Sequence, residues 1–456
     1  RLRLAAQLGS NLRGVCYVLD EPTIGLHPRD NRRLMTTIAE LKKKGNTIVV
    51  VEHDPYTVRS ADYVIDLGPG AGLDGGHVVV AGTPRQVAEA RNSVTGQFLK
   101  RGLQHPMRGQ RRDWRTRKFI TVVGASEHNL KNISVRIPLG TFVCVTGVSG
   151  SGKSTLVRDV LLNGLRAQLH RTPVGYGRHE TITGVEQVSR VLEVDQSPIG
   201  RTPRSVPATY VGFFDDIRRA FAKTLDAGVR GYSASRFSVT ARGGRCEHCA
   251  GQGQLTVEMS FLPNVKVTCD QCNGNRYNPE TLGIRLKGKS IADVLNMTVM
   301  EASDFFGDFP AVKRPLQLLV DIGLGYLTLG QPSPTMSGGE SQRIKQSAEL
   351  AKPPRNHTHY VHEEPTTGLH TADVVRLLSV LHTLVDRGNT VLVIEHNLDI
   401  VAEADYIIDL GPEGGDAGGE VVATGSPEEI MQDGARSYTA RFLADSLRAS
   451  CPRRSL

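Results

Sequence analysis

Residues 147–154 read Gly-Val-Ser-Gly-Ser-Gly-Lys-Ser, which fits the pattern G-x-x-x-x-G-K-[ST] of a phosphate-binding loop, or P-loop. The apolar residues 141–145 before it are typical of a strand, and residues 155–169 after it are typical of a helix. Such glycines let backbone N–H groups converge on a polyphosphate, and the helix adds its positive N-terminal end. An incidental Gly/Ser-rich turn is the alternative, and the flanking strand and helix argue against it.

We therefore expect a nucleotide and Mg²⁺ at this loop, with Lys153 on the β- and γ-phosphates and the Ser154 hydroxyl on the metal. The residues expected to bind the nucleotide are Gly147, Ser149, Gly150, Ser151, Gly152, Lys153, Ser154 and Thr155. The metal also needs an acid, and the attacking water needs a polarising group. Glu363 and Glu364, at the end of a short strand, are expected to provide the two in that order.

One module occurs twice in the chain, at an offset of 343 residues. Residues 17–27 read YVLDEPTIGLH and residues 360–370 read YVHEEPTTGLH, and the match continues without insertion as far as Pro84 and Pro427. A Glu-His pair ending in His53 recurs as the pair ending in His396. An exposed histidine after a strand is often ordinary surface, but the repetition favours a function, in which His396 contacts the γ-phosphate.

Each copy alternates strands with a helix, which indicates an α/β fold. In the first copy, residues 15–19 and 47–51 are expected strands and residues 31–43 an expected helix. The short β-branched strand 47–51 is typical of a parallel sheet covered on both faces. The first copy is also expected to lack its front half.

A Gly-Gly pair opens a further expected helix. Residues 334–343 read Pro-Thr-Met-Ser-Gly-Gly-Glu-Ser-Gln-Arg, and we expect the helix over residues 341–350. Its N-terminus would give a second backbone site for anions. Taken alone, however, Ser-Gly-Gly is only a loop.

Two Cys-x-x-Cys pairs lie 19 residues apart, inside the spacing window of a zinc site. The expected Zn²⁺ ligands are Cys246, Cys249, Cys269 and Cys272, and four thiolates form a closed structural site. Small residues after each pair allow the tight turns of a zinc knuckle, and His248 is expected to be a bystander. Free thiols and a redox pair are alternatives, but glycine-flanked double pairs hold metal better than they exchange electrons. A DnaJ-like zinc chaperone module would need four such units.

The composition narrows the class of protein to which the chain can belong. The 456 residues carry 55 Lys+Arg against 47 Asp+Glu, and the 39% hydrophobic and 22% charged residues argue against disorder. The apolar runs are strand-sized, so we expect no membrane association. The cysteine pattern favours a reducing compartment, the cytoplasm.

The positive charge is concentrated in two segments. Residues 100–118 carry a net +7 and include the only Trp, and we expect an exposed linker there. Residues 201–245 carry a net +6, with interleaved aromatic residues at positions 213, 214, 232 and 237. This composition suits contact with a phosphate backbone, although a solvated helical face would look similar. The candidate DNA contacts are Arg201, Arg204, Arg242 and Arg245.

Together, these motifs resemble the ATP-binding-cassette (ABC) ATPases. The chain is most similar to the UvrA family, the damage-sensing subunits of bacterial UvrABC excinucleases. That match rests on residues 147–156, on Gly-Arg-Thr-Pro-Arg-Ser at 200–205, on Pro-Ala-Thr-Tyr at 207–210, on the cysteine pairs and on the duplicated Glu-Pro-Thr-x-Gly-Leu-His.

The resemblance implies two cassettes per chain, a homodimer, and ATP held between the P-loop of one cassette and the signature loop of the other. It places Gln196 in a glutamine loop, Glu363 and Glu364 in a Walker B motif, and His396 as the switch histidine. The implied signature residues are Ser337, Gly338, Gly339, Glu340 and Gln342. The implied remnant of the first cassette's ATP machinery is Asp20, Glu21 and His53. The implied partners are damaged duplex DNA and a UvrB-like protein.

The second Walker B motif departs from the family pattern. It reads His-Tyr-Val-His-Glu-Glu over residues 359–364, where the family has an apolar strand ending in Asp-Glu. A buried His362 would cost about 1–3 kcal/mol without a hydrogen-bond partner. Glu363 keeps the charge but is one methylene longer, which bears on how the metal is positioned.

The expected architecture is an ABC-type P-loop cassette with a zinc-binding insertion, preceded by the C-terminal half of another cassette. The expected parts are residues 1–98 (first cassette half), 99–118 (basic linker), 119–445 (second cassette, with the signature and zinc insertion at 200–290) and 446–456 (tail). The expected function is ATP-dependent recognition of DNA damage, with weak or no ATPase activity for the chain alone. A non-hydrolysing DNA- or protein-binding module and a soluble ABC ATPase of a resistance system are alternatives, and the zinc motif disfavours the latter.

Overall fold

The computed structural model describes residues 12–70, 72, 75–105, 110–170, 175–259, 265–352, 357–433 and 435–449. Two compact units are present: the first unit comprises residues 1–195 and 354–456, and the second unit comprises residues 196–353. The expected tail lies outside the described residues beyond position 449. The other boundaries between expected parts remain predictions.

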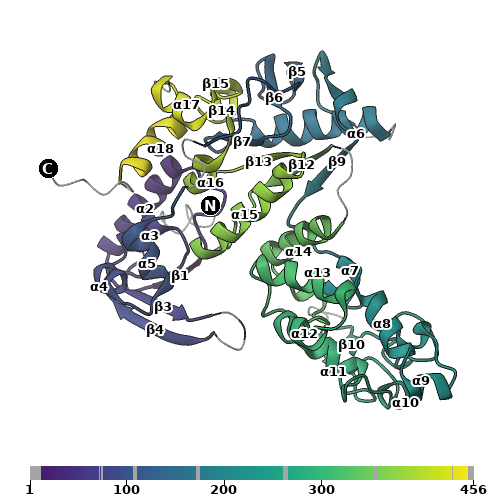
Figure 1. Cartoon of the computed structure of the whole chain (residues 1–456). Helices are drawn as coiled ribbons and strands as arrows, with labels where there is room; N and C mark the ends of the chain where they lie inside the picture. The colour runs from purple at the N-terminus through teal and green to yellow at the C-terminus, as the bar shows by residue number, and fades with distance from the viewer. Residues whose placement is uncertain are drawn as a thin grey trace. The chain divides into compact units, whose positions relative to one another are not determined.

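The first unit is built on a six-stranded sheet (Figure 1). Its strand order is β15 (Glu420–Gly425), β14 (Tyr406–Gly411), β7 (Phe142–Gly147), β13 (Thr390–Ile394), β12 (Thr358–Glu363) and β9 (Arg190–Val194). All neighbours run parallel except β15, which is antiparallel to β14. Because the interior strands are covered on both faces, they consist of nearly continuous apolar residues.

A smaller antiparallel sheet and several helices complete this part of the first unit. The sheet has the order β6 (Ile133–Pro138), β5 (Phe119–Ala125), β8 (Thr181–Thr183). The helices are η2 (Thr155–Leu162), α6 (Asn163–His170), η3 (Val185–Gln187), α15 (Thr371–Asp386), α16 (Leu398–Glu403), η6 (Gly415–Ala417), α17 (Pro427–Asp433) and α18 (Tyr438–Ala449). The expected helix after the P-loop is therefore present, and its first part, η2, is a π-helix, a form that recurs at functional sites.

The first copy of the repeat has the same elements as the second. They are β1 (Cys16–Asp20), α2 (Pro28–Lys43), β2 (Thr47–Val51), α3 (Pro55–Ser60), β3 (Val64–Gly68), β4 (His77–Gly82), α4 (Pro84–Glu89) and α5 (Val94–Arg101). Helices α2 and α15, and strands β2 and β13, coincide when shifted by 343 residues. Helix α2 begins three residues before the expected start, because His27 caps it and Pro28 occupies its first position.

The expected burial of strand 47–51 on both faces is wrong. In β2 the side chains of Val49 and Val51 are about half exposed, whereas the matching β13 is buried throughout. The difference follows from the neighbours: β13 lies between β12 and β7, while β2 pairs with β1 alone among the described strands. Local sequence sets the strand, and the neighbouring strands set its burial.

The segment expected to be an exposed linker, residues 100–118, is mostly exposed where the structure describes it, but some of its side chains are held against the first unit. Arg111 donates to the carbonyls of Ala402 and Ala404 and pairs with Glu428 at 2.7 Å. Trp114 packs on the hydrophobic core of the first unit, with its ring 4.7 Å from that of Tyr406. Part of the basic charge of this segment is therefore used in intramolecular ion pairs, those of Arg111, Arg112 and Arg115.

The second unit is mainly helical. Its elements are α7 (Pro207–Val211), α8 (Phe214–Ala222), α9 (Leu225–Val229), η4 (Ala234–Phe237), β10 (Gln254–Val257), β11 (Val265–Thr268), α10 (Pro279–Leu282), α11 (Ile291–Asn296), α12 (Val299–Phe305), α13 (Pro310–Asp321), η5 (Ser333–Thr335) and α14 (Gly338–Ala351). Strands β10 and β11 form an antiparallel hairpin between the two cysteine pairs. No helix in the described part of the chain is both long and apolar enough to cross a membrane.

Candidate nucleotide and zinc sites

The P-loop follows β7 and requires glycine at its turns. Gly147, Gly150 and Gly152 all have positive φ, and a Cβ on Gly147 would lie only 2.0 Å from the carbonyl oxygen of Leu410. The Lys153 ammonium lies within this loop and donates to the carbonyls of Gly147 at 3.0 Å and Val148 at 2.8 Å. The backbone thus has the curled form that the sequence pattern predicts.

Asn129 supports this loop and was missed by the sequence motifs. Its side-chain amide donates to the carbonyl of Gly150 at 3.0 Å and to that of Gly415 at 3.1 Å. Gly415 in turn donates from its backbone to Gly150 at 3.0 Å. Because Asn129 lies in a turn between β5 and β6, no local pattern indicated this role.

The expected metal-binding side chains meet at the start of η2. The Ser154 hydroxyl donates to Glu363 Oε1 at 3.0 Å, and Arg158 lies 3.9 Å from the other carboxylate oxygen. Glu363 ends β12, so its longer side chain still reaches the P-loop serine. A hydroxyl beside a carboxylate is an oxygen donor set that fits Mg²⁺.

Glu364 and His396 lie together, as expected for a catalytic acid and a switch histidine. His396 Nε2 is 3.8 Å from Glu364 Oε1. Glu364 has φ 42°, a left-handed conformation that costs energy in a non-glycine residue and that clusters at functional sites. The buried Glu395 accepts from the backbone N–H of His396 at 2.6 Å, which fixes the turn after β13.

The first copy repeats this geometry. Glu21 has φ 41°, and its Oε1 lies 3.7 Å from His53 Nε2. Glu52 accepts from the backbone of His53 at 2.9 Å, as Glu395 does in the second copy. Asp20 ends β1, opposite Val51 in β2. The remnant expected in the first copy is therefore folded like its counterpart.

The two copies face each other across a cavity of about 460 Å³ in the first unit. Glu21 and His53 line it from one side and Glu364 and His396 from the other. A Cβ on Gly25 would lie 2.8 Å from Glu364 Oε2, so the first copy approaches the carboxylate of Glu364 closely. The carbonyl oxygen of Gly25 also accepts a hydrogen bond at 3.3 Å from the hydroxyl of Ser149 in the P-loop.

The two unusual histidines of β12 are buried and neutral. His359 and His362 are fully buried, and burial lowers the pKa of each to about 3. Neither ring carries a positive charge next to the carboxylate of Glu363 at neutral pH. The departure from an apolar strand therefore changes the strand's polarity without adding charge.

The expected signature residues begin α14 in the second unit. Ser337 caps the helix, accepting from the backbone of Glu340 at 3.2 Å, while Glu340 accepts from that of Ser337 at 2.8 Å. The helix thus begins three residues before the expected start. A Cβ on Gly338 would lie 3.1 Å from the side chain of Gln196, so the glutamine loop and the signature loop are neighbours within this unit. Gln342 is buried in the helix.

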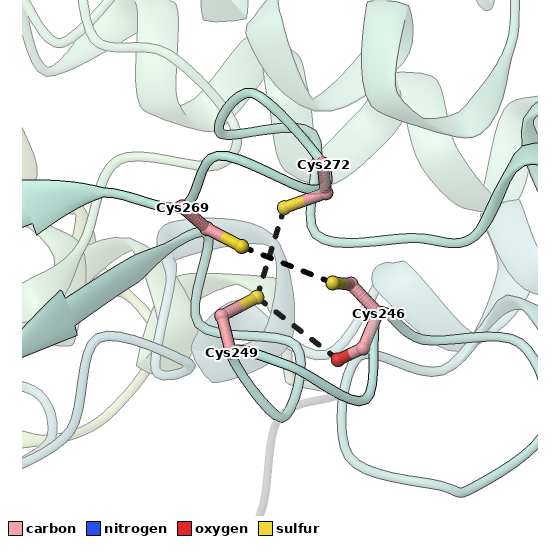
Figure 2. A group of neighbouring side chains, drawn as sticks. All are labelled: Cys246, Cys249, Cys269 and Cys272. Carbon is pink, nitrogen blue, oxygen red and sulfur yellow. Dashed lines mark hydrogen bonds between the residues drawn. The ribbon is translucent and has the colours of Figure 1, made fainter.

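The four cysteines converge as expected for zinc (Figure 2). Cys246 and Cys269 have sulfurs 3.9 Å apart, and Cys249 and Cys272 have sulfurs 3.7 Å apart. Four sulfurs at about 2.3 Å from a tetrahedral zinc are separated by about 3.8 Å, so the spacing fits the ion. The exposed His248 lies outside this group of four, but its ring is 3.4 Å from Asp270 and also lies near the Cys269 sulfur, so its expected role as a bystander stays a prediction.

Two further features of this cluster bear on the ionisation of its thiols. The backbone N–H of Gly253 donates to the Cys249 sulfur at 3.2 Å, which stabilises a thiolate. Burial raises the pKa of Cys272 to about 12, so this thiol would keep its proton at neutral pH unless a cation displaced it. A Cβ on Gly251 would lie 2.0 Å from the carbonyl oxygen of Val239, which explains the glycine in this knuckle.

The basic segment 201–245 differs from a nucleic-acid surface in two respects. Its aromatic residues Phe213, Phe214 and Phe237 are buried, so the aromatic spacing reflects a core rather than a stacking platform. Arg245 donates to the Thr240 carbonyl at 2.8 Å and pairs with a neighbouring acid, which holds it in the knuckle. Among the candidate DNA contacts, Arg201 and Arg242 are exposed and Arg204 is half-buried.

Comparisons of the sequence and the structure with known proteins agree with the nucleotide-site and cysteine-cluster geometry described above. No protein-family model matches the chain. UvrABC system protein A of Thermus thermophilus is 57% identical over 444 residues, covering 97% of this chain and 46% of the relative. Its counterpart in Aquifex aeolicus is 57% identical over 448 residues, covering 98% of this chain and 48% of the relative.

The crystal structure of UvrA2 from Deinococcus radiodurans matches with a TM-score of 0.89 and 48% identity, covering 98% of this chain and 54% of that chain. The chain spans about half the length of the curated relatives it matches. The P-loop, the Walker B acids, the signature loop and the cysteine cluster all lie within the matched region. The chain therefore belongs to the UvrA family of ABC ATPases, and it corresponds to the carboxy-terminal portion of a UvrA protein.

Proposed function

We propose that this chain binds and hydrolyses ATP and uses the cycle to recognise damaged duplex DNA, which it then passes to a UvrB-like partner. The observation that carries the proposal is the assembly of Ser154, Glu363, Glu364 and His396 around the P-loop. The names of the relatives support the repair context.

Each side chain has a defined task in the proposed reaction. Lys153 and the loop amides hold the β- and γ-phosphates, and Ser154 with Glu363 holds Mg²⁺, which neutralises phosphate charge when bound. Glu364 orients and polarises the attacking water, and His396, beside it, contacts the γ-phosphate. Gln196 completes the site as the resemblance implies.

The sequence holds one P-loop and one signature loop. ABC-type hydrolysis uses a P-loop and a signature loop from different cassettes, so we propose that Ser337 of a second copy closes over the loop at Gly147. Turnover per chain should then rise with chain concentration, because the active species is a homodimer.

DNA contact is proposed through Arg201, Arg204 and Arg242, which belong to the same unit as the zinc knuckle. The knuckle holds its shape through Zn²⁺ bound by the four cysteines, and the guanidinium groups would contact backbone phosphates without reading bases. Such binding weakens steeply with rising salt.

The test compares wild type with Lys153→Ala, using Lys43→Ala on the exposed face of α2 as a control that removes the same charge. ATP binding is measured with a fluorescent analogue, and turnover is measured with and without UV-irradiated duplex DNA. Lys153→Ala should lower both by about 10²-fold or more, as expected when phosphate positioning is lost. Unchanged turnover in that variant would overturn the proposal.

A second candidate is a non-hydrolysing binding module. The observation that favours it is the pair of departures in β12, where His362 replaces an apolar residue and Glu363 replaces Asp. Tight ATP binding without turnover at any chain concentration would support this candidate over the first.

A further inference from the structure

His27 closes the first copy's YVLDEPTIGLH motif and is almost completely buried. Its Nδ1 accepts from the backbone N–H of Arg29 at 3.2 Å, which caps helix α2. Burial lowers the pKa of His27 to about 3, so the ring is neutral and its single N–H is on Nε2. That nitrogen lies 3.2 Å from the Oγ1 atom of Thr439, a residue of helix α18 in the second copy.

Thr439 continues the contact to the base of the P-loop. Its hydroxyl donates to Asp409 Oδ1 at 2.8 Å, and the same carboxylate accepts from Thr146 at 2.6 Å and from Ser437 at 2.6 Å. Asp409 is 1% exposed and therefore depends on these donors. Thr146 directly precedes Gly147, so the network ends where β7 turns into the P-loop.

The second copy has the reciprocal contact. His370 caps α15 through its Nδ1, and its Nε2 lies 3.1 Å from Thr95 Oγ1 of the first copy. Thr95 donates to Asp66 at 2.7 Å, and Ser93 donates to the same carboxylate at 2.6 Å.

The matching residues Thr95 and Thr439 are 344 positions apart, whereas His27 and His370 are 343 apart. One inserted residue has therefore shifted the sequence while the contact is retained, so the contact is not a by-product of equal spacing. The two networks differ in one respect. Asp409 lies on β14, which pairs with the P-loop strand β7, whereas Asp66 lies on β3, which among the described strands pairs only with β4.

Each crossing histidine also touches the switch histidine of the other copy. The ring centroids of His27 and His396 are 6.0 Å apart, with the rings edge to face. Those of His370 and His53 are 6.3 Å apart in the same arrangement. His27 thus contacts both the support of the P-loop and the switch histidine beside Glu364.

We propose that His27 is a positioning residue for the P-loop: through Thr439 and Asp409 it fixes Thr146, so that docking of the first copy sets the conformation of the loop. The effect of His27 on the conformation of the P-loop does not depend on whether the chain hydrolyses ATP. Only the expected effect on nucleotide binding rests on the proposed ATPase function.

The experiment compares His27→Phe with His370→Phe. Phenylalanine keeps the ring packing in both places and removes both ring nitrogens, so the two variants lose equivalent contacts. Only the contact that is lost in His27→Phe belongs to a network that includes the P-loop strand β7. Amide hydrogen exchange over residues 146–153 is followed by mass spectrometry without nucleotide, and thermal melting reports the general cost to the fold.

Exchange over residues 146–153 should rise by about tenfold in His27→Phe, the scale of one lost hydrogen bond. It should stay near wild type in His370→Phe at a similar loss of melting temperature. Equal exchange in the two variants would overturn the proposal. Thr439→Val should reproduce His27→Phe without adding to it in the double variant, and Thr439→Ser should restore protection. These threonine variants carry the test if His27→Phe does not fold.

Nucleotide binding gives the catalytic readout. The dissociation constant for the fluorescent ATP analogue should rise about fivefold to tenfold in His27→Phe, in line with one weakened contact. If the proposed ATPase function is wrong, ATP binding should be unaltered in Lys153→Ala. The hydrogen-exchange result would then still decide whether His27 positions the P-loop.

Discussion

Replacing His362 by leucine should reduce the acid sensitivity of the first unit. His362 is fully buried in β12, and burial lowers its pKa to about 3. In the unfolded chain a histidine has a pKa of about 6.5. Because the unfolded chain binds the proton more tightly, the folded state has its full stability above pH about 6.5 and loses it as the pH falls toward 3.

The magnitude follows from the gap between the two pKa values. Between pH 7.5 and pH 5.0, one such histidine lowers the free energy of unfolding by about 2 kcal/mol, since each pH unit below 6.5 costs about 1.4 kcal/mol. The loss at pH 5.0 should therefore be about 2 kcal/mol smaller in His362→Leu than in wild type. Leucine is a natural choice because Leu19 occupies the matching position of the first copy.

Trp114 provides the assay. It is the only tryptophan, and it packs on the core of the first unit beside Tyr406, so its fluorescence reports the unfolding of this unit alone. Urea unfolding at pH 7.5 and 5.0 gives the two free energies for each protein. His77→Leu, at an exposed position of β4, serves as the control and should behave like wild type. An undiminished acid loss in His362→Leu would refute the reasoning.

Three further outcomes are expected. Glu364→Gln should keep ATP binding but lower turnover by about 10²-fold or more, because the attacking water loses its base; turnover within threefold of wild type would remove Glu364 from that role. Cys269→Ser should lower bound zinc, measured by atomic absorption, from about one ion per chain to nearly none, while Cys16→Ser at an exposed position should not. Arg112→Met should lower the free energy of unfolding by about 3–5 kcal/mol, because it leaves the buried Asp405 without its ion-pair partner at 3.0 Å; a loss below 1 kcal/mol in urea unfolding would show that the pair contributes little.

Part of the site could be predicted because its chemistry requires a local pattern. A backbone cradle needs glycines at fixed spacing before a helix, so residues 147–154 indicated the P-loop. Four thiolates around one ion need paired cysteines, so the zinc cluster was also predictable. The repeat indicated Glu21 and His53 as counterparts of Glu364 and His396, and the structure gives the two pairs nearly equal separations.

Other features had no local pattern. Asn129 contacts the P-loop from a distant turn, and Asp409 accepts hydrogen bonds from three hydroxyl groups that lie in two separate segments of the chain. The aromatic residues of segment 201–245 suggested a binding surface, but Phe213 and Phe237 are buried, because spacing along the chain does not say which face a neighbour covers.

Most of the elements, the two copies, the phosphate loop and the cysteine cluster could be predicted from residue types at short, fixed spacing. Which strands are buried and how the copies meet depend instead on packing between segments that are far apart in the chain. Strand β2 is half exposed and β13 is buried although both are rich in β-branched residues, since burial depends on the neighbouring strands. His27 likewise acquires its role from Thr439, a residue 412 positions away that packing brings within 3.2 Å.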